Sequence, residues 1–337
     1  MPGPWLGSIR AWIACLSSDL RAASRYTHYM LDALAPHGIS LIAADLDGTL
    51  LSPDGTLSAR TVAALRAVEE AGIAVVLATG RRHSFALQAL AAAGLHRDTV
   101  LITSNGAVTR TLAGSLLDRH RLPASVAQAL CRALEAYRDA VLFTFDRTGP
   151  GAMVAERLDT LHRSIAKWVE LNAHEIATIT PLEAAFAQGE SPVQGMICGS
   201  LARMAEAVTR LDAPQSLPLR RAISVHRTEY AARDLCIVDL LPADCSKGRA
   251  LLRVAAERGI APAQMLAIGD NMNDAEMLSV SGHAVVMDNA APDLRSLAKA
   301  CGWSVAPGHA EDGAAQVLEA VLSGDFSGQA RPAFMVD

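Results

Sequence analysis

Short apolar runs that end abruptly in polar residues are the feature that most constrains how this chain can fold. Residues 41–44, 73–78 and 100–102 are such runs, and each leads into a cluster of Asp, Thr, Asn or Gly residues. Between them, residues 58–71 and 85–93 carry apolar side chains at helical spacing. Continuous apolar strands that alternate with helices are typical of a parallel sheet covered on both faces. The sequence therefore predicts an α/β fold.

The same pattern returns near the C-terminus. Residues 265–268 run into Gly269 and Asp270, and residues 284–287 run into Asp288. Helices are expected over residues 248–258, 274–279 and 292–300. Ligands of open parallel sheets collect at the carboxyl ends of the strands, and every one of these polar clusters lies at such an end. We therefore expect the functional site at this edge of the sheet.

The middle of the chain follows a different pattern. Helical stretches at 125–137 and 201–211 mix with shorter strand candidates at 141–145 and 195–199. We interpret this region as a second α+β unit inserted into the first. The predicted parts are an N-terminal extension (1–38), a core domain in two segments (39–108 and 225–330), an inserted domain (109–224) and a tail (331–337). The extension is interpreted as a loose helix or a partly ordered segment, with Met30 as an alternative start.

Composition excludes several classes of function. The 30 basic and 35 acidic residues give a net charge of −5, which argues against a general nucleic-acid binder. Aromatic residues make up only 4% of the chain, so stacking platforms for single strands are not expected either. The longest apolar runs are too short to span a bilayer. The six cysteines are scattered without a C-x-x-C pair, which favours reduced thiols and a cytoplasmic protein.

The segment that follows the first apolar run carries two carboxylates one residue apart. Asp45 and Asp47 can both address one small site, and Gly48 allows backbone N–H groups to approach an anion. A simple polar turn is the alternative interpretation. A calcium loop would require Gly at its sixth position and Glu at its twelfth, where this chain has Leu50 and Thr56.

A second acidic cluster covers residues 269–274. Its carboxylates, Asp270 and Asp274, stand beside two asparagines, Asn271 and Asn273. This set of oxygen donors suits Mg²⁺, which takes few protein carboxylates and keeps other oxygen ligands. Asp and Asn are also favoured at helix N-caps, so capping is an alternative. Both interpretations can hold at once.

Two further features lie at the start of predicted helices. Thr79 and Gly80 place a hydroxyl group and a flexible backbone beside the same edge of the sheet, although a routine strand-to-helix turn would look alike. Lys247 is one of only three lysines, with Lys167 and Lys299. A compact ammonium group suits a point charge on a phosphoryl group, and a solvated surface lysine is the alternative.

Taken together, the four features resemble the haloacid dehalogenase-like superfamily. The likeness is strongest to the Cof-type hydrolases with a type IIB cap, which are Mg²⁺-dependent phosphatases. The motifs that carry it, over about residues 40–322, are DLDGTL, ATGR, SNGA, SKG and GDNMNDAEML. The resemblance implies a Rossmann-like parallel-sheet core, with the inserted α+β domain as the type IIB cap. The N-terminal extension departs from it, and so does Asp288, which stands where the resemblance leads us to expect Gly.

The resemblance also implies roles for individual residues. Asp45 would attack phosphorus and form an aspartyl-phosphate, and Asp47 would serve as general acid and base. Mg²⁺ would be held by Asp45, the backbone carbonyl of Asp47 and Asp270, with support from Asp274. Charge on the phosphoryl oxygens would be offset by the metal and by groups of Leu46 (its N–H), Thr79, Gly80, Lys247 and Asn273.

The expected substrate is a small sugar phosphate or a related phosphorylated metabolite. A phosphotransferase or phosphomutase that uses the same intermediate is an alternative, and so is a regulatory module that binds phosphate. Other side chains are weaker candidates: His83 and Cys245, the group of His162, Arg163, Lys167 and Trp168, and the cap contacts Arg147, His226 and Arg227. A helix-surface position is favoured for His83, and a solvated helix for the group around Trp168.

Overall fold

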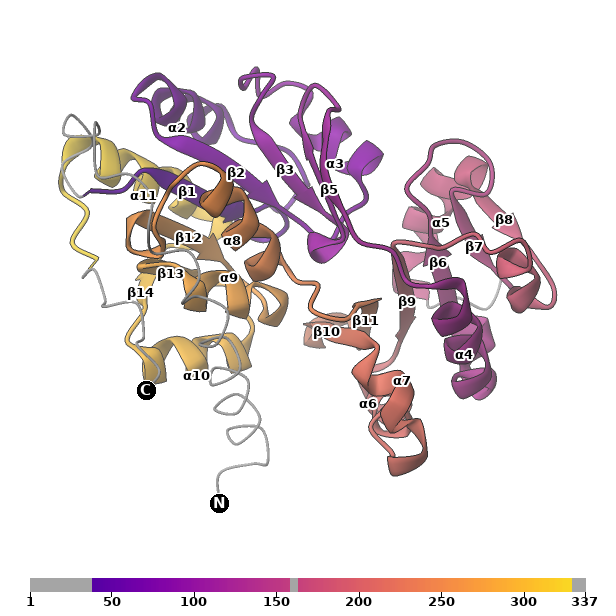
Figure 1. Ribbon diagram of the computed structural model, residues 1–337. Coiled ribbons are helices and arrows are strands. Elements are labelled where there is room, and N and C mark those ends of the chain that lie inside the picture. The colour runs from indigo at the N-terminus through magenta and orange to yellow at the C-terminus, as the bar shows by residue number, and fades with distance from the viewer. Residues whose placement is uncertain (1–37, 158–162, 329–337) are drawn as a thin grey trace.

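The computed structural model describes residues 38–157 and 163–328. Within these ranges the chain forms two sheets, one in a core domain and one in an inserted cap domain (Figure 1). Nearly all of the expected extension (1–38), the tail (331–337) and His162 lie outside the described residues. No helix in the described ranges has both the length and the apolar character needed to cross a membrane.

The core sheet has eight strands in the order β14-β13-β12-β1-β2-β3-β4-β5. The strands from β14 to β3 run parallel, and β4 and β5 extend the sheet as an antiparallel hairpin. The strands are β1 (Leu41–Asp45), β2 (Ala74–Ala78), β3 (Val100–Thr103), β4 (Val108–Thr111), β5 (Leu116–Arg119), β12 (Met265–Gly269), β13 (His283–Met287) and β14 (Ser304–Ala306). The predicted parallel α/β core is thus confirmed.

Helices cover both faces of the core sheet. They are α2 (Ala59–Glu70), α3 (His83–Leu90), α8 (Lys247–Glu257), α9 (Ala275–Val280), α10 (Pro292–Cys301) and α11 (Gly313–Ser323). Ile42 and Ala44 of β1 pack in the cluster that includes α2, α3 and α11. Leu41 and Ala43 pack in the cluster that includes α8, α9 and α10. Because successive residues of β1 point to opposite covered faces, the strand sequence is apolar throughout.

The cap sheet has six strands in the order β10-β11-β9-β6-β7-β8. All neighbours are antiparallel except β7 and β8. Its strands are β6 (Val141–Thr144), β7 (Met153–Ala155), β8 (Ile176–Thr178), β9 (Gln194–Gly199), β10 (Ile223–Tyr230) and β11 (Leu235–Pro242). Its helices are α4 (Ala124–Ala133), α5 (Ala166–Asn172), α6 (Leu201–Leu211) and α7 (Leu217–Arg221).

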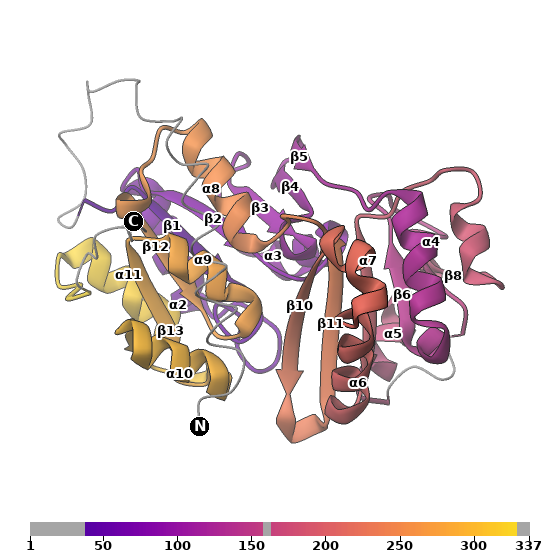
Figure 2. The same ribbon diagram turned by 60° about the horizontal axis from the view of Figure 1, so that its bottom comes forward.

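The two faces of the cap sheet have different environments. Phe143, Ile197 and Val238 pack with residues of α4 and α6 in the main cap core. The opposite face carries Leu142 and Met196, which pack against Trp168 and Val169 of α5 in a smaller cluster. In Figure 2, β10 and β11 lie on the side of the cap that is nearest to the core domain. Leu142 and Met196 line one cavity together with Asp45 and Asp270, so the second face covers the carboxyl ends of β1 and β12.

The sheet partners correct both predicted domain boundaries. The sequence pattern places residues 109–119 in the inserted domain, but they contain most of β4 and all of β5, which pair within the core sheet. Residues 225–242 were assigned to the core, but they lie in β10 and β11 of the cap sheet. The chain therefore returns to the core only after Pro242. The alternating polar and apolar pattern of β10 fits an antiparallel strand of either domain, so the sequence alone could not assign its sheet.

Candidate active site

The loop after β1 places the first acidic pair. Asp45 is the last residue of β1 and is buried. The chain then turns back on itself, since the N–H groups of Leu50 and Leu51 both donate to the Leu46 carbonyl, at 3.1 and 2.8 Å. Gly48 has a φ of +84°, and a Cβ there would lie 2.2 Å from Asp270 Oδ2. Glycine is thus required both by the backbone and by the neighbouring carboxyl group.

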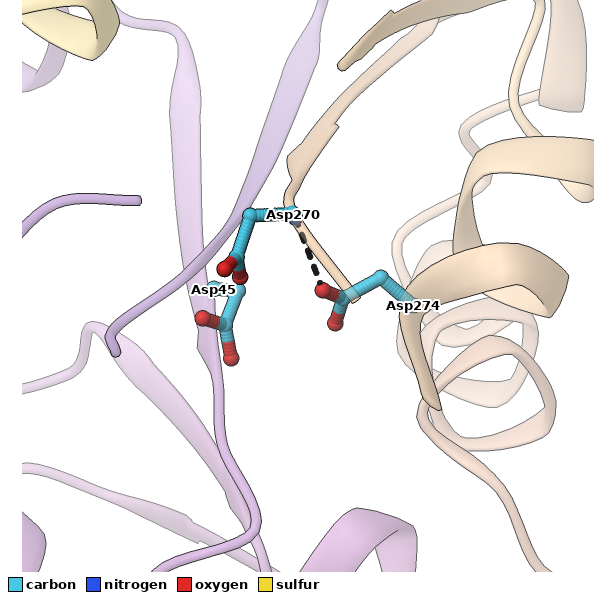
Figure 3. Close-up of side chains that lie close together, drawn as sticks. All are labelled: Asp45, Asp270 and Asp274. Carbon is cyan, nitrogen blue, oxygen red and sulfur yellow. Dashed lines mark hydrogen bonds between the residues drawn. The ribbon is translucent and has the colours of Figure 1, made fainter. Parts of the chain in front are cut away.

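The loop after β12 brings two more carboxyl groups to the same place. Asp274 Oδ2 accepts hydrogen bonds from the backbone N–H groups of Asp270 and Asn271, each at 3.1 Å. Figure 3 shows Asp45, Asp270 and Asp274 clustered where their strands and loops meet. One oxygen from each of the three lies within 4.8 Å of the other two. The prediction that these acids gather at one edge of the sheet is confirmed.

Lys247 lies at the centre of this cluster. Ser246 caps α8 by accepting from the N–H of Arg249 at 3.0 Å, which makes Lys247 the first residue of the helix. Its Nζ donates to Asp45 Oδ1 at 2.5 Å and to Asp274 Oδ1 at 2.6 Å. Burial alone would lower the pKa of this ammonium group, but Asp274 and Asp45 raise it above its usual value. The surface-lysine alternative is therefore wrong.

The cluster contains too little positive charge for all of its carboxyl groups to ionise. Burial raises the pKa of Asp45 to about 8; Lys247 opposes the shift, while Asp274 and Asp47 add to it. Burial and the Asp45 carboxylate likewise raise the pKa of Asp270 well above its usual value. Three buried acids beside one ammonium group cannot all ionise without further positive charge. This set of oxygen donors fits a hard divalent cation such as Mg²⁺.

The hydrogen bonds distinguish the three acids as cation ligands. Both oxygens of Asp274 are engaged, one by Lys247 and one by two backbone N–H groups. Asp45 uses one oxygen for Lys247, and Asp270 accepts only a long 3.5 Å bond from the Thr49 hydroxyl, among the side-chain bonds of the described residues. Asp45 and Asp270 therefore retain oxygens for a cation, while Asp274 orients the residues around it.

The remaining predicted residues lie around this cluster in different ways. The Leu46 side chain belongs to the apolar core, so only its backbone can face a ligand. Thr79 is buried after β2, and its hydroxyl accepts from the N–H of Arg81 at 3.1 Å. Gly80 lines the cavity of the site. Asn273 donates from Nδ2 to Asn105 Oδ1 at 3.0 Å, and its own Oδ1 is buried without a partner among the described residues.

Two residues of the site were missed by the sequence analysis, although their motifs were noted. Arg81 forms a two-point ion pair with Asp47, at 2.7 Å from Nε and 2.5 Å from Nη2. Asn105, in the turn after β3, links Asn273 to Asp239 of the cap. The ATGR and SNGA motifs contained both residues, but the contacts span 34 and 134 positions of sequence and leave no local signal.

A cavity of about 570 Å³ joins the acidic cluster to the cap. Its core side includes Asp45, Asp47 and Asp270, and its cap side includes Trp168 and Asp239. This volume is typical of a pocket for a small molecule. The cap sheet therefore forms one wall of the space in which a substrate would meet the carboxyl groups.

Trp168 and Lys167 both line the cavity. Trp168 is half-buried, so the expectation of a solvated helix is wrong for it, whereas Lys167 is exposed, as expected. Trp168 packs on the cap sheet because its large apolar ring gains more from burial than from solvent. Arg163, from the same predicted group, is exposed.

The other weak candidates are not among the residues that line this cavity. Arg147, His226 and Arg227 do not line this cavity. Burial raises the pKa of the Cys245 thiol to about 12, which disfavours a nucleophilic thiolate. Both ring nitrogens of His83 are buried without a partner in the described ranges, so its expected helix-surface position is wrong.

The loop after β13 explains the departure at position 288. The Asp288 side chain is exposed and lies 3.4 Å from Arg295. The φ angle of Asp288 is not positive, so a glycine is not required at this position. The neighbouring Asn289 donates to the Gly48 carbonyl at 2.8 Å and thereby supports the acidic loop.

Fold and site together define a class of protein: a parallel α/β enzyme whose inserted cap covers a carboxylate cluster. The family model described as haloacid dehalogenase-like hydrolase matches residues 42–318. The protein belongs to this family, and the family resemblance predicted from its motifs is confirmed.

Two similar proteins are phosphatases by name. The chain is 34% identical over 265 residues to an HMP-PP phosphatase of Serratia proteamaculans. The aligned region covers 76% of this chain and 86% of the relative. The chain is 30% identical over 264 residues to an HMP-PP phosphatase of Escherichia coli O157:H7, with the same coverage. The family match and these relatives support the predicted enzyme class, a haloacid dehalogenase-like phosphatase that hydrolyses phosphomonoesters.

Solved structures share the fold. A haloacid dehalogenase-like hydrolase from B. subtilis superposes with a TM-score of 0.68 at 24% identity and covers 83% of this chain and 99% of its own. The subclass IIB sugar phosphatase BT4131 superposes with a TM-score of 0.65 at 18% identity and covers 83% of this chain and 98% of its own. Both likenesses agree with the predicted core and inserted cap.

Proposed function

We propose that this protein is a Mg²⁺-dependent phosphatase that hydrolyses a small phosphorylated metabolite through an aspartyl-phosphate on Asp45. One observation carries the proposal: Asp45, which pairs with the ammonium group of Lys247, and Asp270, which has no ion pair among the described residues, both line the cavity under the cap. This arrangement leaves negative charge that a cation can balance and a carboxylate that a phosphate ester can reach.

The residues that would hold Mg²⁺ are Asp45, Asp270 and the backbone carbonyl of Asp47, with Asp274 orienting the loop around them. When bound, the cation supplies positive charge between an anionic carboxylate and an anionic phosphoryl group. Like charges at contact would otherwise repel each other.

In the proposed first step, an Asp45 oxygen bonds to phosphorus while the bond to the leaving oxygen breaks. Asp47 donates a proton to that oxygen. In the second step Asp47 takes a proton from a water molecule, which attacks phosphorus and releases phosphate, so that Asp45 is regenerated. Arg81 binds both Asp47 oxygens, at 2.7 and 2.5 Å. This ion pair must therefore break before Asp47 can contact the leaving oxygen of the substrate.

Several groups would stabilise the charge on the transferred phosphoryl oxygens. Lys247 contributes an ammonium group, and Asn273 lies at the mouth of the same cluster. The N–H of Leu46, Thr79 and Gly80 complete the set that the family resemblance assigns to phosphate binding. Removal of one such donor in other enzymes costs about 2.7–4 kcal/mol of the activation barrier.

Substrate candidates come from the relatives and from the volume of the cavity. Proteins similar to this chain are named HMP-PP phosphatase and sugar phosphatase. We propose that the substrate is of comparable size, because the cavity of about 570 Å³ is closed on one side by the cap sheet.

The test is a panel of phosphorylated metabolites, assayed for phosphate release with Mg²⁺ and with a chelator. We expect Mg²⁺-dependent release from at least one sugar phosphate or HMP-PP, and none from Asp45→Asn. The matched control is Asp288→Asn, which removes an exposed carboxylate outside the cavity and should keep full activity. Turnover by Asp45→Asn at the wild-type rate would reject Asp45 as the nucleophile. Transfer of the phosphoryl group to a sugar hydroxyl instead of water would identify the phosphotransferase alternative.

A further inference from the structure

The cap wall of the cavity combines apolar and polar side chains. Its side chains come from the face of the cap sheet that lacks the covering helices α4 and α6, and from α5. The apolar members are Leu142, Met153, Ile165, Trp168, Leu171, Met196, Leu235 and Ile237. The polar members are Thr144, Lys167, Gln194, Thr228, Tyr230, Arg233 and Asp239. Hydroxyl groups of a ligand that lie against the apolar members would lose hydrogen bonds to water.

One of the polar members is a buried carboxyl group that lies among apolar side chains. Asp239 of β11 lies opposite Met196 of β9, and Met196 in turn lies opposite Leu142 of β6. The three side chains thus form a row across the sheet. Asp239 is only 4% exposed, yet it lines the cavity. A buried acid in such a place is costly unless its hydrogen-bonding capacity is used.

The hydrogen bonds of Asp239 leave part of that capacity open. Oδ1 accepts from Gln194 Nε2 at 2.6 Å, and Oδ2 accepts from Asn105 Nδ2 at 2.7 Å. Two carboxylate oxygens can accept about four hydrogen bonds in total. Both partners are themselves buried amides, so the carboxyl group is held rigidly while its free acceptor positions remain for a ligand.

The same contact connects Asp239 to the acidic cluster. Asn105, which has a φ of 51°, contacts both sides: its Nδ2 donates to Asp239, and its Oδ1 accepts from Asn273 Nδ2 at 3.0 Å. The turn that carries Asn105 is fixed against the Lys247 loop, because a Cβ on Gly106 would lie 2.1 Å from the Ser246 carbonyl oxygen. The position of Asp239 relative to the phosphate site is therefore set by short, buried contacts.

We infer that Asp239 is the specificity-determining residue for the leaving group, which it recognises by accepting a hydrogen bond from an N–H or O–H donor. The leaving group itself lies with an apolar face against Met196 and Trp168. This inference rests on the proposed phosphatase function of the site. It assigns the cap a preference for a ring with one donor at its edge over a ring without a donor and over a polyol.

The test uses four esters of phosphoric acid: benzyl phosphate, 3-aminobenzyl phosphate, 3-hydroxybenzyl phosphate and glucose 6-phosphate. We expect the wild type to show a kcat/KM at least about tenfold higher for one or both donor-bearing rings than for benzyl phosphate. Comparison of 3-aminobenzyl phosphate with 3-hydroxybenzyl phosphate shows whether Asp239 accepts from an N–H or from an O–H group. Asp239→Asn should reduce this preference on the order of 10- to 100-fold, because a hydrogen bond to a charged acceptor is lost.

Two further variants separate selection from general damage. Asp212→Asn removes a carboxylate that pairs with Arg220 and does not line the cavity, and should leave the preference unchanged. Met196→Ala should lower kcat/KM for all three rings more than for glucose 6-phosphate, because it removes the apolar support. Hydrolysis of benzyl phosphate by Asp239→Asn reports that this variant is folded.

Two results would overturn the inference on its own: equal kcat/KM values for the three rings in the wild type, or an undiminished preference in Asp239→Asn. A wild type that favours glucose 6-phosphate over every ring would also contradict it. If no ester is hydrolysed in the presence of Mg²⁺, the proposed function fails, and the inference fails with it.

Discussion

Three buried carboxyl groups lie beside one ammonium group where the strands β1 and β12 end. Lys247 binds Asp45 and Asp274, while Asp270 lies beside them without a cationic partner among the described ion pairs. Removing one partner from a buried charge cluster leaves the others uncompensated, which costs more than the pair itself contributes. The residues of the site are therefore coupled, and a change at one alters the protonation of the rest.

Lys247→Met tests this coupling. We expect the free energy of unfolding to fall by about 3–5 kcal/mol at neutral pH, because two buried carboxylates lose their counter-charge. Part of the loss should be recovered at lower pH, where the acids are protonated. Urea unfolding at two pH values measures both effects. The control is Lys299→Met, which removes an exposed lysine and should change stability by no more than about 0.5 kcal/mol. Equal stabilities of the two variants at neutral pH would refute the coupling.

The raised pKa of Asp45 predicts how stability depends on pH without metal. Because burial raises this pKa to about 8 in the folded chain, the folded state retains a proton that the unfolded state has released. The contribution of Asp45 therefore falls as pH rises between about 4 and 8, by at most about 1.4 kcal/mol per pH unit. The free energy of unfolding of the wild type minus that of Asp45→Asn, both measured in chelator, should decrease as pH rises from about 4 to 8. Saturating Mg²⁺ should reverse the trend, and a difference independent of pH would contradict the account.

At the scale of elements, the site depends on how closely the loops approach each other. Gly48 and Gly72 both have a positive φ, of +84° and +79°. A Cβ would meet Asp270 at position 48 but no atom within 4 Å at position 72. Replacing glycine by alanine therefore strains the backbone at both positions, but it creates a steric clash only at position 48.

Gly48→Ala and Gly72→Ala form a matched pair. Both should lose about 1–2 kcal/mol of stability from the left-handed backbone. Only Gly48→Ala should also lose Mg²⁺ binding and most phosphate release, because Asp270 must move away from the new methyl group. Calorimetric titration with Mg²⁺ and the phosphate assay measure the two effects. Full metal affinity in Gly48→Ala would show that Asp270 is not held where the structure places it.

Local patterns made the elements largely predictable. The expected helices over residues 58–71 and 201–211 correspond to α2 and α6, because apolar spacing and Ser caps specify both. The acidic cluster could also be anticipated, since strand ends of a parallel sheet share one edge. The Arg81–Asp47 pair and the Asn105–Asp239 contact could not, because they depend on which loops meet in space. The sheet of β10 was misassigned for the same reason.

At the scale of the whole molecule, ion pairs join cap and core. Arg82, just ahead of α3, pairs with Glu175 of the cap, and both side chains are about nine-tenths buried. Arg110 and Arg119 of the core hairpin both bind Asp146, at 2.8 and 2.9 Å. Movement of the cap away from the core would require these contacts to loosen, since they join the two domains.

Glu175→Gln should shift the molecule toward a more open form. The variant leaves Arg82 buried without its counter-charge when the cap is closed, a state that becomes less favourable by up to a few kcal/mol. Small-angle scattering should show a larger radius of gyration than for the wild type, and KM should rise. The control is Glu190→Gln, whose exposed pair with Arg147 lies within the cap. An unchanged radius in Glu175→Gln would exclude this pair as a determinant of closure.

The most direct test of the central proposal is to trap the covalent intermediate. The enzyme is mixed with Mg²⁺ and a substrate from the panel, quenched in acid during turnover, and digested for mass spectrometry. The account predicts a phosphoryl group on Asp45 that accumulates before phosphate is released and is absent in chelator. A phosphoryl group on another residue, or release of phosphate at the full rate with Asp45 never modified, would contradict it.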